Sequence, residues 1–435
     1  MASTNRAVGA ITVSDTSGID MSTSKVTSLV LEPTNGTDGA SKYYVDNNVI
    51  FLGGGDSFVT SDSTTSNFIN FKSIKRGITT TIGADLTSIY FTKNLFFKLS
   101  NQFTADTTSI QLFGGNGKSV GSVLAPNGKL YCIPFNSTNV IIVDTVNKVV
   151  DSTTLTGLSG TTKWWGGVMA PNGKIYCAPN NHSSVLVIDP LKNTLDTSTF
   201  TGFSGTDKWS GCALAPNGKI YFIPSGQTIV LIIDSNSGIA DTTTLTGFNG
   251  ASKWGTGAIA QNAKIYCAPT GSTAMLIIDT VTDTADTTTI TGFTTGADKW
   301  FSATLNIDKK MYFTPLNESR VLVVNTFTDT PDTTTLPALN TGAGKYIGSV
   351  LASNGKIYTA PHRDTKMLVI DPTNNLVDVT TFTGLVGLNK SAGIINGLDG
   401  ALYTAPFNTT YMMTIIPGSN SILPEFVFSS YHNKF

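Results

Sequence analysis

Short apolar runs alternate with polar turns along most of this chain, with the spacing of β-strands. Within residues 163–207, apolar or β-branched runs occur at Gly166–Ala170, Lys174–Ala178, Val185–Ile188 and Thr197–Thr201. Turn-forming residues separate such runs about every 8–12 residues, and no window shows the helical period of about 3.6 residues. The pattern therefore predicts four short strands in this segment.

The same pattern recurs as a repeat of 45 or 46 residues. Each copy opens on a lysine, and these are Lys118, Lys163, Lys208, Lys253, Lys299, Lys345 and Lys390. A tyrosine and a proline three residues later keep the same register, from Tyr131 and Pro134 to Tyr403 and Pro406. A period of this size indicates a propeller or a solenoid, and four strands per repeat fit a propeller blade.

A single four-stranded blade has apolar residues on both faces, so it needs a neighbour on each side. A closed ring supplies both neighbours. The predicted fold is therefore all-β: a seven-bladed β-propeller of four-stranded blades, with a small N-terminal β-rich attachment region. Small residues in the first strand, as in Gly166–Ala170, suit the crowded centre of the ring.

A signature of the fourth strand indicates how the ring closes. Six repeats carry an aspartate followed mostly by threonines, at Asp151, Asp196, Asp241, Asp286, Asp332 and Asp378. The seventh copy would fall on Leu423, whereas Asp106 stands 45 residues before Asp151. We therefore expect residues 106–113 to supply the outer strand of the last blade, because this pairing leaves no open strand edge.

The stretch PNGKIYCAPNNHSSVLVIDPLKNTLDT, from Pro171 to Thr197, resembles the YVTN-type propeller repeat. That repeat runs from a Pro-Asp/Asn-Gly turn through a tyrosine strand to a Val-Ile-Asp strand. The resemblance covers about 320 residues and implies a seven-bladed propeller. The Gly-His and Trp-Asp pairs of WD40 repeats are absent, which disfavours that family. Propellers host unrelated activities, so the resemblance implies little about function.

Composition excludes several partners. The chain has 435 residues, a net charge of −1 and only 13% charged residues, with no basic patch, which argues against nucleic acid as a partner. No apolar run approaches the roughly 18 residues that span a membrane, so we expect no membrane insertion. The first 15 residues lack the apolar core of a signal peptide.

No catalytic or metal-binding pattern is recognisable, and we expect a chain that is not an enzyme and holds no metal or cofactor. The three histidines share no motif, and the three glutamates are too few to favour a two-carboxylate glycosidase. Cys132, Cys177 and Cys267 occupy one repeat position, too far apart for a disulfide, and Cys212 lies on an inner strand. Small buried apolar groups are the favoured interpretation of all four.

Aspartates at the end of the third strand leave two interpretations open. They are Asp144, Asp189, Asp234, Asp279 and Asp371. Calcium binding is one, above all around Asp279–Asp283. The other is an Asx turn that satisfies backbone N–H groups, which the repetition in most blades favours.

The N-terminal quarter has a different character, and we divide the chain at 1–47, 48–105 and 106–435. Residues 48–105 predict short strands at 49–52, 68–71, 78–82 and 88–91, as a bridge or stalk. The propeller region comprises the closing strand, the repeats at 118–420 and a tail at 421–435, where Phe426–Phe428 suits another edge strand. Within 1–47 we expect a strand at Lys25–Leu31 and a helix that starts after Asp38.

Residues 18–47 also resemble a segment of tail-fibre and other virion proteins of phages and large DNA viruses. The matching residues are Ile19, Met21, Lys25, Val26, Leu29, Pro33, Thr34, Asp38, Ala40, Ser41, Lys42, Tyr44, Val45 and Asp46. Gly39 departs from the usual alanine. The resemblance implies attachment to other virion proteins through residues 1–47 and a homotrimer. The alternative is an ordinary strand-turn-helix entry to a domain.

One group of candidate ligand residues lies where the outer strand of one blade connects to the inner strand of the next. Aromatic residues follow the repeat lysine, and the candidate pairs are Lys163 and Trp164, Lys208 and Trp209, Lys253 and Trp254, and Lys299 and Trp300. Such a rim suits a glycan or an anionic receptor. Structural packing between blades is the favoured alternative, because residues repeated in every blade usually serve the scaffold.

The loops between second and third strands vary from blade to blade and are better binding candidates. They contain His182, Gln227, Glu318, His362 and Arg363. Four of these loops carry N-x-S/T, an acceptor for glycosylation in a eukaryotic secretory setting.

The predicted function is that of a virion surface protein, a fibre or capsid decoration, that presents a propeller for host attachment through a host-surface glycan or protein. The alternative is a bacterial surface or secreted YVTN-type binding propeller. A polysaccharide-degrading propeller enzyme is disfavoured by the lack of acid/base pairs.

Overall fold

The computed structural model describes residues 104–418 in full and, before them, only short strands. The chain divides into two compact units, 1–98 and 99–435. Within the described residues, no helix is long and apolar enough to span a membrane.

The strands of the first unit form three small sheets. A three-stranded antiparallel sheet is followed by pairings of β4 with β7 and of β5 with β6. Their bounds are β1 (Arg6–Val8), β2 (Ile11–Ser14), β3 (Gly18–Ile19), β4 (Phe51–Leu52), β5 (Phe68–Lys72), β6 (Thr79–Gly83) and β7 (Ile89–Tyr90). The strand and helix expected within 20–47, like the tail at 421–435, lie outside the described residues.

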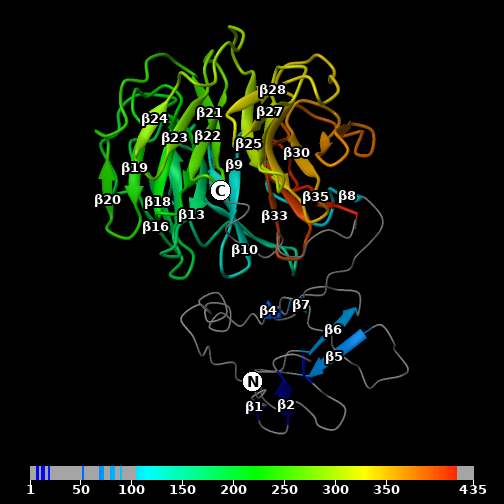
Figure 1. Ribbon diagram of the computed structural model, residues 1–435. Coiled ribbons are helices and arrows are strands. Elements are labelled where there is room, and N and C mark those ends of the chain that lie inside the picture. The colour runs from blue at the N-terminus through cyan, green and yellow to red at the C-terminus, as the bar shows by residue number, and fades with distance from the viewer. Residues whose placement is uncertain are drawn as a thin grey trace. The chain divides into compact units, whose positions relative to one another are not determined.

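Residues 104–418 form seven four-stranded antiparallel sheets, so the predicted seven-bladed propeller is confirmed (Figure 1). The inner strands are β9 (Ser119–Leu124), β13 (Trp164–Met169), β17 (Trp209–Leu214), β21 (Trp254–Ile259), β25 (Trp300–Leu305), β29 (Tyr346–Leu351) and β33 (Ser391–Asn396). The second strands are β10 (Lys129–Pro134), β14 (Ile175–Pro179), β18 (Lys219–Pro224), β22 (Lys264–Pro269), β26 (Lys310–Pro315), β30 (Ile357–Pro361) and β34 (Leu402–Pro406).

The outer half of each blade is shorter. The third strands are β11 (Ile141–Asp144), β15 (Leu186–Asp189), β19 (Leu231–Asp234), β23 (Leu276–Asp279), β27 (Leu322–Asn325), β31 (Val369–Asp371) and β35 (Thr414–Ile416). The outermost strands are β12 (Val149–Asp151), β16 (Thr194–Asp196), β20 (Ile239–Asp241), β24 (Thr284–Asp286), β28 (Thr330–Asp332), β32 (Leu376–Asp378) and β8 (Thr104–Asp106).

The last blade takes its outermost strand from the start of the repeat region, as the aspartate signature predicts. β8 pairs with β35, with Asp106 opposite Thr414 and Thr104 opposite Ile416. The regular strand ends at Asp106, where the aspartate signature begins, so it lies just before the expected 106–113. Residues beyond it still join the blade, because Met412 N–H donates to the Ile110 carbonyl (3.1 Å).

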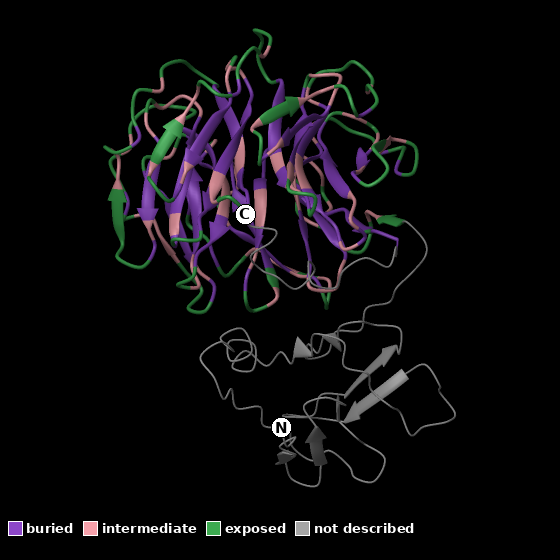
Figure 2. Ribbon diagram, viewed as in Figure 1, coloured by how far each residue is buried: buried purple, intermediate pink, exposed green. Residues whose placement is uncertain are grey.

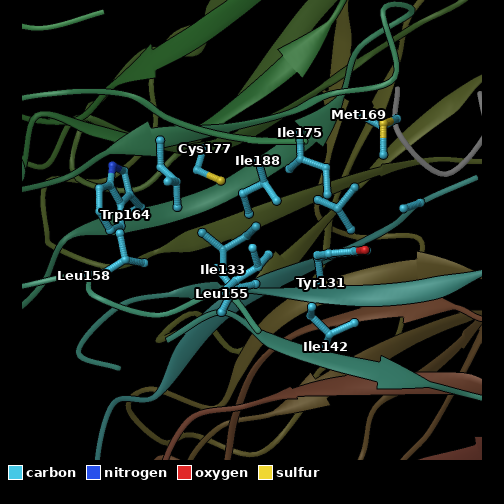
Figure 3. Close-up of a cluster of buried hydrophobic side chains, with 14 residues drawn as sticks. Tyr131, Ile133, Ile142, Leu155, Leu158, Trp164, Met169, Ile175, Cys177 and Ile188 are labelled. Atoms are coloured by element: carbon cyan, nitrogen blue, oxygen red, sulfur yellow. The ribbon is translucent and has the colours of Figure 1, made fainter. Parts of the chain in front are cut away.

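Blades are numbered by their inner strands, from β9 in blade 1 to β33 in blade 7. They pack on one another through apolar side chains that alternate along the strands. The junction of blades 1 and 2 buries Ile133 and Ile142 of the first against Trp164 and Ile175 of the second (Figure 3). The middle strands of each blade are buried, whereas several outermost strands and turns are exposed (Figure 2). Each blade is thus stabilised by its neighbours, because apolar burial is the dominant favourable term.

Glycine allows the inner strands to converge. A Cβ at Gly348 would lie 2.5 Å from Gly393 Cα of the next blade. Both residues have positive φ, 93° and 130°, at a bulge of the inner strand. The small residues predicted for the ring centre therefore serve both close approach and backbone conformation.

The strand-ending aspartates form turns. Asp279 Oδ1 accepts hydrogen bonds from the N–H groups of Val281 (2.9 Å) and Thr282 (3.1 Å). Asp283 is instead engaged by Lys219 Nζ of the preceding blade (2.5 Å). No group of three metal-ligating side chains occurs in the part of the chain that the structure describes. The contacts seen are those of the Asx-turn interpretation.

Candidate functional site

One end of the propeller carries both groups of candidate residues. The repeat lysine precedes each inner strand, and the loop between second and third strands returns to the same end. Asn180 N–H, at the start of such a loop, donates to the Lys163 carbonyl (2.8 Å). We call this end the lysine face; it consists of these loops and of the connections from each outermost strand to the next inner strand.

The repeat lysines lie inside the lysine face rather than on it. Lys208 is fully buried, and the other six are at most 4% exposed. Lys163 Nζ donates to the carbonyl of Gly160 (2.9 Å), and Lys253 Nζ reaches three carbonyls within 2.9 Å. Burial lowers the pKa of Lys163 and Lys253 to about 8. These side chains hold the connections in place.

The aromatic partners are buried as well. Trp164 Nε1 donates to the Ser184 carbonyl (2.8 Å), and Trp209, Trp254 and Trp300 each reach the carbonyl twenty residues later in the same way. Trp209 also meets Phe203 of the preceding connection edge to face, with ring centroids 5.3 Å apart. The four Lys–Trp pairs thus occupy positions in the scaffold, and ligand binding by them stays a prediction.

The five loop candidates differ in how accessible they are. His182 is half-buried and lies against Trp164 (4.5 Å between centroids), and burial lowers its pKa. His362 is buried, and its Nδ1 donates to the Ser391 carbonyl (2.8 Å). Gln227 Nε2 donates to Ser204 O (2.7 Å), and Glu318 is partly exposed. Arg363 is exposed, and its Nε donates to Asn389 Oδ1 (2.9 Å). The structure does not gather these five into one site.

An aromatic cluster, which the sequence analysis did not single out, lies at the start of the inner strands. Trp165 of blade 2 contacts Phe301 of blade 5, with centroids 5.4 Å apart, and Phe135 of blade 1 (5.3 Å). Phe407 of blade 7 joins through Phe135 (5.7 Å). The cluster joins blades from opposite sides of the ring. Trp165 and Phe301 stand two residues after the repeat lysine, whereas Phe135 and Phe407 follow the repeat proline, and both positions vary between blades.

Two neighbouring blades lack the aromatic residue after the lysine. Blades 7 and 1 carry Ser391 and Ser119 there. Beside Ser391 lies a small, partly open cavity of about 10 Å³, room for a single water-sized group. It is lined by Leu385, Lys390, Ser391, Thr404, Thr409, Tyr411 and Met413.

The connections into these two blades also expose apolar side chains. Phe113 is 40% exposed, Val386 76% and Leu388 71%. The counterpart of Phe113 at the junction into blade 2, Leu158, is only 8% exposed, beside Trp164. Leu385, which holds this position before Ser391, is also only 8% exposed, so at the junction into blade 7 the exposed apolar residues are Val386 and Leu388.

The cysteines lie within the inner and second strands. Cys132, Cys177 and Cys267 are buried free thiols, as is fitting for small core groups, and Cys212 is partly exposed. Burial raises the pKa of Cys132 to about 12. No set of side chains suited to a metal was found among the described residues.

Comparison with solved structures places this fold among seven-bladed β-propellers. Virginiamycin B lyase from Staphylococcus aureus matches with a TM-score of 0.60 and 12% identity, over 73% of this chain and 100% of the lyase. A streptogramin B lyase structure matches with a TM-score of 0.59, 12% identity and coverage of 73% and 99%. The extracellular domain of a hybrid two component system from B. thetaiotaomicron matches at 0.55 and 10%, over 74% of this chain and 40% of that one.

No protein-family model matches the sequence, and no curated protein matches it. At 8–14% identity, the structural matches show the fold alone. The chain is therefore described by its class, a seven-bladed propeller whose structural relatives include extracellular bacterial domains and lyases.

The comparison contradicts one prediction. The absence of a recognised catalytic motif predicted that the chain is not an enzyme, yet the structures it resembles include lyases. The inference was wrong because it relied on local sequence motifs. A propeller brings together loops from distant repeats, so a catalytic group on this fold leaves no contiguous pattern in the sequence.

Proposed function

We propose that this chain is a surface protein that binds a host receptor or another partner through the lysine face of its propeller. The observation that supports the proposal is that the repeated residues and the variable loops of that face have different roles. The lysine and tryptophan of the repeat make their contacts inside the scaffold, whereas the loops that differ between blades hold exposed side chains such as Arg363. Rigid scaffolds with variable loops are the common design of binding surfaces.

We further propose a virion surface as its location, with residues 1–47 attached to other virion proteins. The likeness of residues 18–47 to fibre-type segments supports this. The alternative, a bacterial surface or secreted binding propeller, is consistent with the extracellular domain among the structural matches.

Two measurements test the proposal. Mass spectrometry of purified virus particles from the source culture should find the chain at a stoichiometric level, and its absence there would leave the bacterial location. A glycan array and cell-binding cytometry with the full chain should give saturable binding. Silence in both would refute a receptor-binding role.

A further inference from the structure

The lysine face is asymmetric in a way that singles out blade 7. The large exposed apolar side chains of the described residues fall mostly on the opposite end, one by one, as with Leu191 and Val281. On the lysine face they are Phe113, Val386 and Leu388, and all three flank blade 7. We call these three side chains the blade 7 patch.

Hydrogen bonds hold the two connections that carry the patch against the blade 7 loop. The blade 7 loop lies between the two connections that carry the apolar side chains. Asn408 N–H donates to the Asn389 carbonyl (3.1 Å), and Asn408 Oδ1 accepts from Gly117 N–H (2.8 Å). On the same loop, Thr410 O accepts from Leu112 N–H (2.7 Å).

The exposed apolar residues replace polar or small ones found elsewhere in the repeat. Four residues before the lysine, Val386 stands where the other blades have Ser159, Ser204, Asn249, Thr295, Thr341 and Gly114. Two residues before it, Leu388 stands where they have Thr161, Thr206, Ala251, Ala297, Ala343 and Asn116. The backbone therefore does not require an apolar side chain at either position, and neighbouring exposed apolar side chains are typical of interaction sites.

Arg363 places a positive charge next to the patch. Arg363 is exposed and contacts Asn389, beside Leu388. None of the ion pairs found among the described residues includes it. The nearest carboxylate in sequence, Asp364, already accepts from Tyr346 Oη (3.1 Å) and Lys366 N–H (3.0 Å). An acidic group on a partner would match this cation.

We infer that the blade 7 patch docks a peptide segment of a partner protein that carries an aliphatic side chain close to an aspartate or glutamate. The aliphatic group covers Val386 and Leu388, while the carboxylate pairs with Arg363. Aliphatic contact at the centre with a charge pair at the rim is the usual arrangement of such interfaces. This inference rests on the proposed binding function and names the partner class for it.

A displayed library of random linear peptides, selected on the full chain, tests the inference. The variant V386S/L388T carries the residues that precede Lys208, and L191S/V281S is a control that removes equally exposed apolar groups from the opposite end. Enriched peptides should combine an aliphatic with an acidic residue. Their affinity should fall about tenfold on V386S/L388T, weaken with salt and on R363Q, and stay unchanged on the control.

The outcomes separate this inference from the function on which it rests. Peptides that bind V386S/L388T as well as the natural chain would overturn the patch and leave a binding propeller in place. A library with no enriched peptide would also overturn it, and the glycan array and cytometry would then decide the proposed function alone. Equal urea midpoints of the variants show that a lost affinity is not lost folding.

Discussion

Two kinds of junction between blades have the same backbone arrangement and differ in one side chain. The junctions into blades 2–6 hold an aromatic residue after the repeat lysine, whereas those into blades 7 and 1 hold a serine. At Trp209 the indole is 1% exposed, meets Phe203 and donates to a carbonyl. At Ser391 the same position leaves a cavity, and its hydroxyl donates to Pro361 O (2.8 Å). The difference shows that the ring keeps its geometry at a junction that lacks the aromatic side chain.

Removal of the closing strand should have the largest effect on this ring. A chain that starts at Gly114 lacks β8 and Ile110, which is 1% exposed. It leaves β35 with an unpaired edge, and we expect a loss on the order of 5 kcal/mol or more and no cooperative thermal transition by circular dichroism. A truncation at Leu99 keeps the strand and is the control. Equal melting of the two truncated chains would refute closure by β8.

Substitutions at equivalent positions sharpen the comparison directly. Trp209→Ser removes a buried indole and its hydrogen bond, and we expect it to lower the free energy of unfolding by roughly 3–5 kcal/mol. Ser391→Ala removes only a hydrogen bond and should cost at most about 1 kcal/mol. Urea unfolding of both variants provides the measurement. A similar cost at the two sites would contradict the difference in filling.

The aspartate of each outermost strand makes stability depend on pH. The Thr154 hydroxyl is the main cause that lowers the pKa of Asp151 to about 2 from 3.8; partial burial opposes it, and backbone N–H groups of Thr153 and Thr154 add to it. The folded chain therefore binds fewer protons than the unfolded chain at pH 2–4. The contribution of Asp151 to stability should be lost as pH drops from about 4 towards 2, which unfolding at stepped pH will show. Asp151→Asn should reduce the slope.

Removal of an outermost-strand aspartate should have the smallest effect on stability, and the effect should be equal at both kinds of junction. Asp241 precedes a filled junction and Asp378 an unfilled one, and each accepts from two backbone N–H groups. Because these contacts are local, Asp241→Ala and Asp378→Ala should each cost about 1 kcal/mol and agree within about 0.5 kcal/mol. Unequal losses in the free energy of unfolding would show that the hydrogen bonds of the aspartate depend on the neighbouring junction.

The repeat made much of the fold predictable. The period located the strands, and the displaced Asp106 indicated the closure, because both depend on local turn chemistry that the sequence displays. Burial of Lys163 was harder to foresee, since a lysine enters a scaffold only when the fold supplies carbonyls for its ammonium group. The cluster of Trp165 with Phe301 joins residues that only the closed ring brings together.

Closure by β8 has a consequence for synthesis. The strand that completes the last blade is the first propeller strand to leave the ribosome, and its partner follows roughly 300 residues later. Until Thr414 has been translated, the nascent chain presents a free sheet edge and an uncovered blade face, the features that recruit chaperones or promote exchange between neighbouring chains. Folding of this protein should therefore end in one late, all-or-none step and depend on the speed of translation.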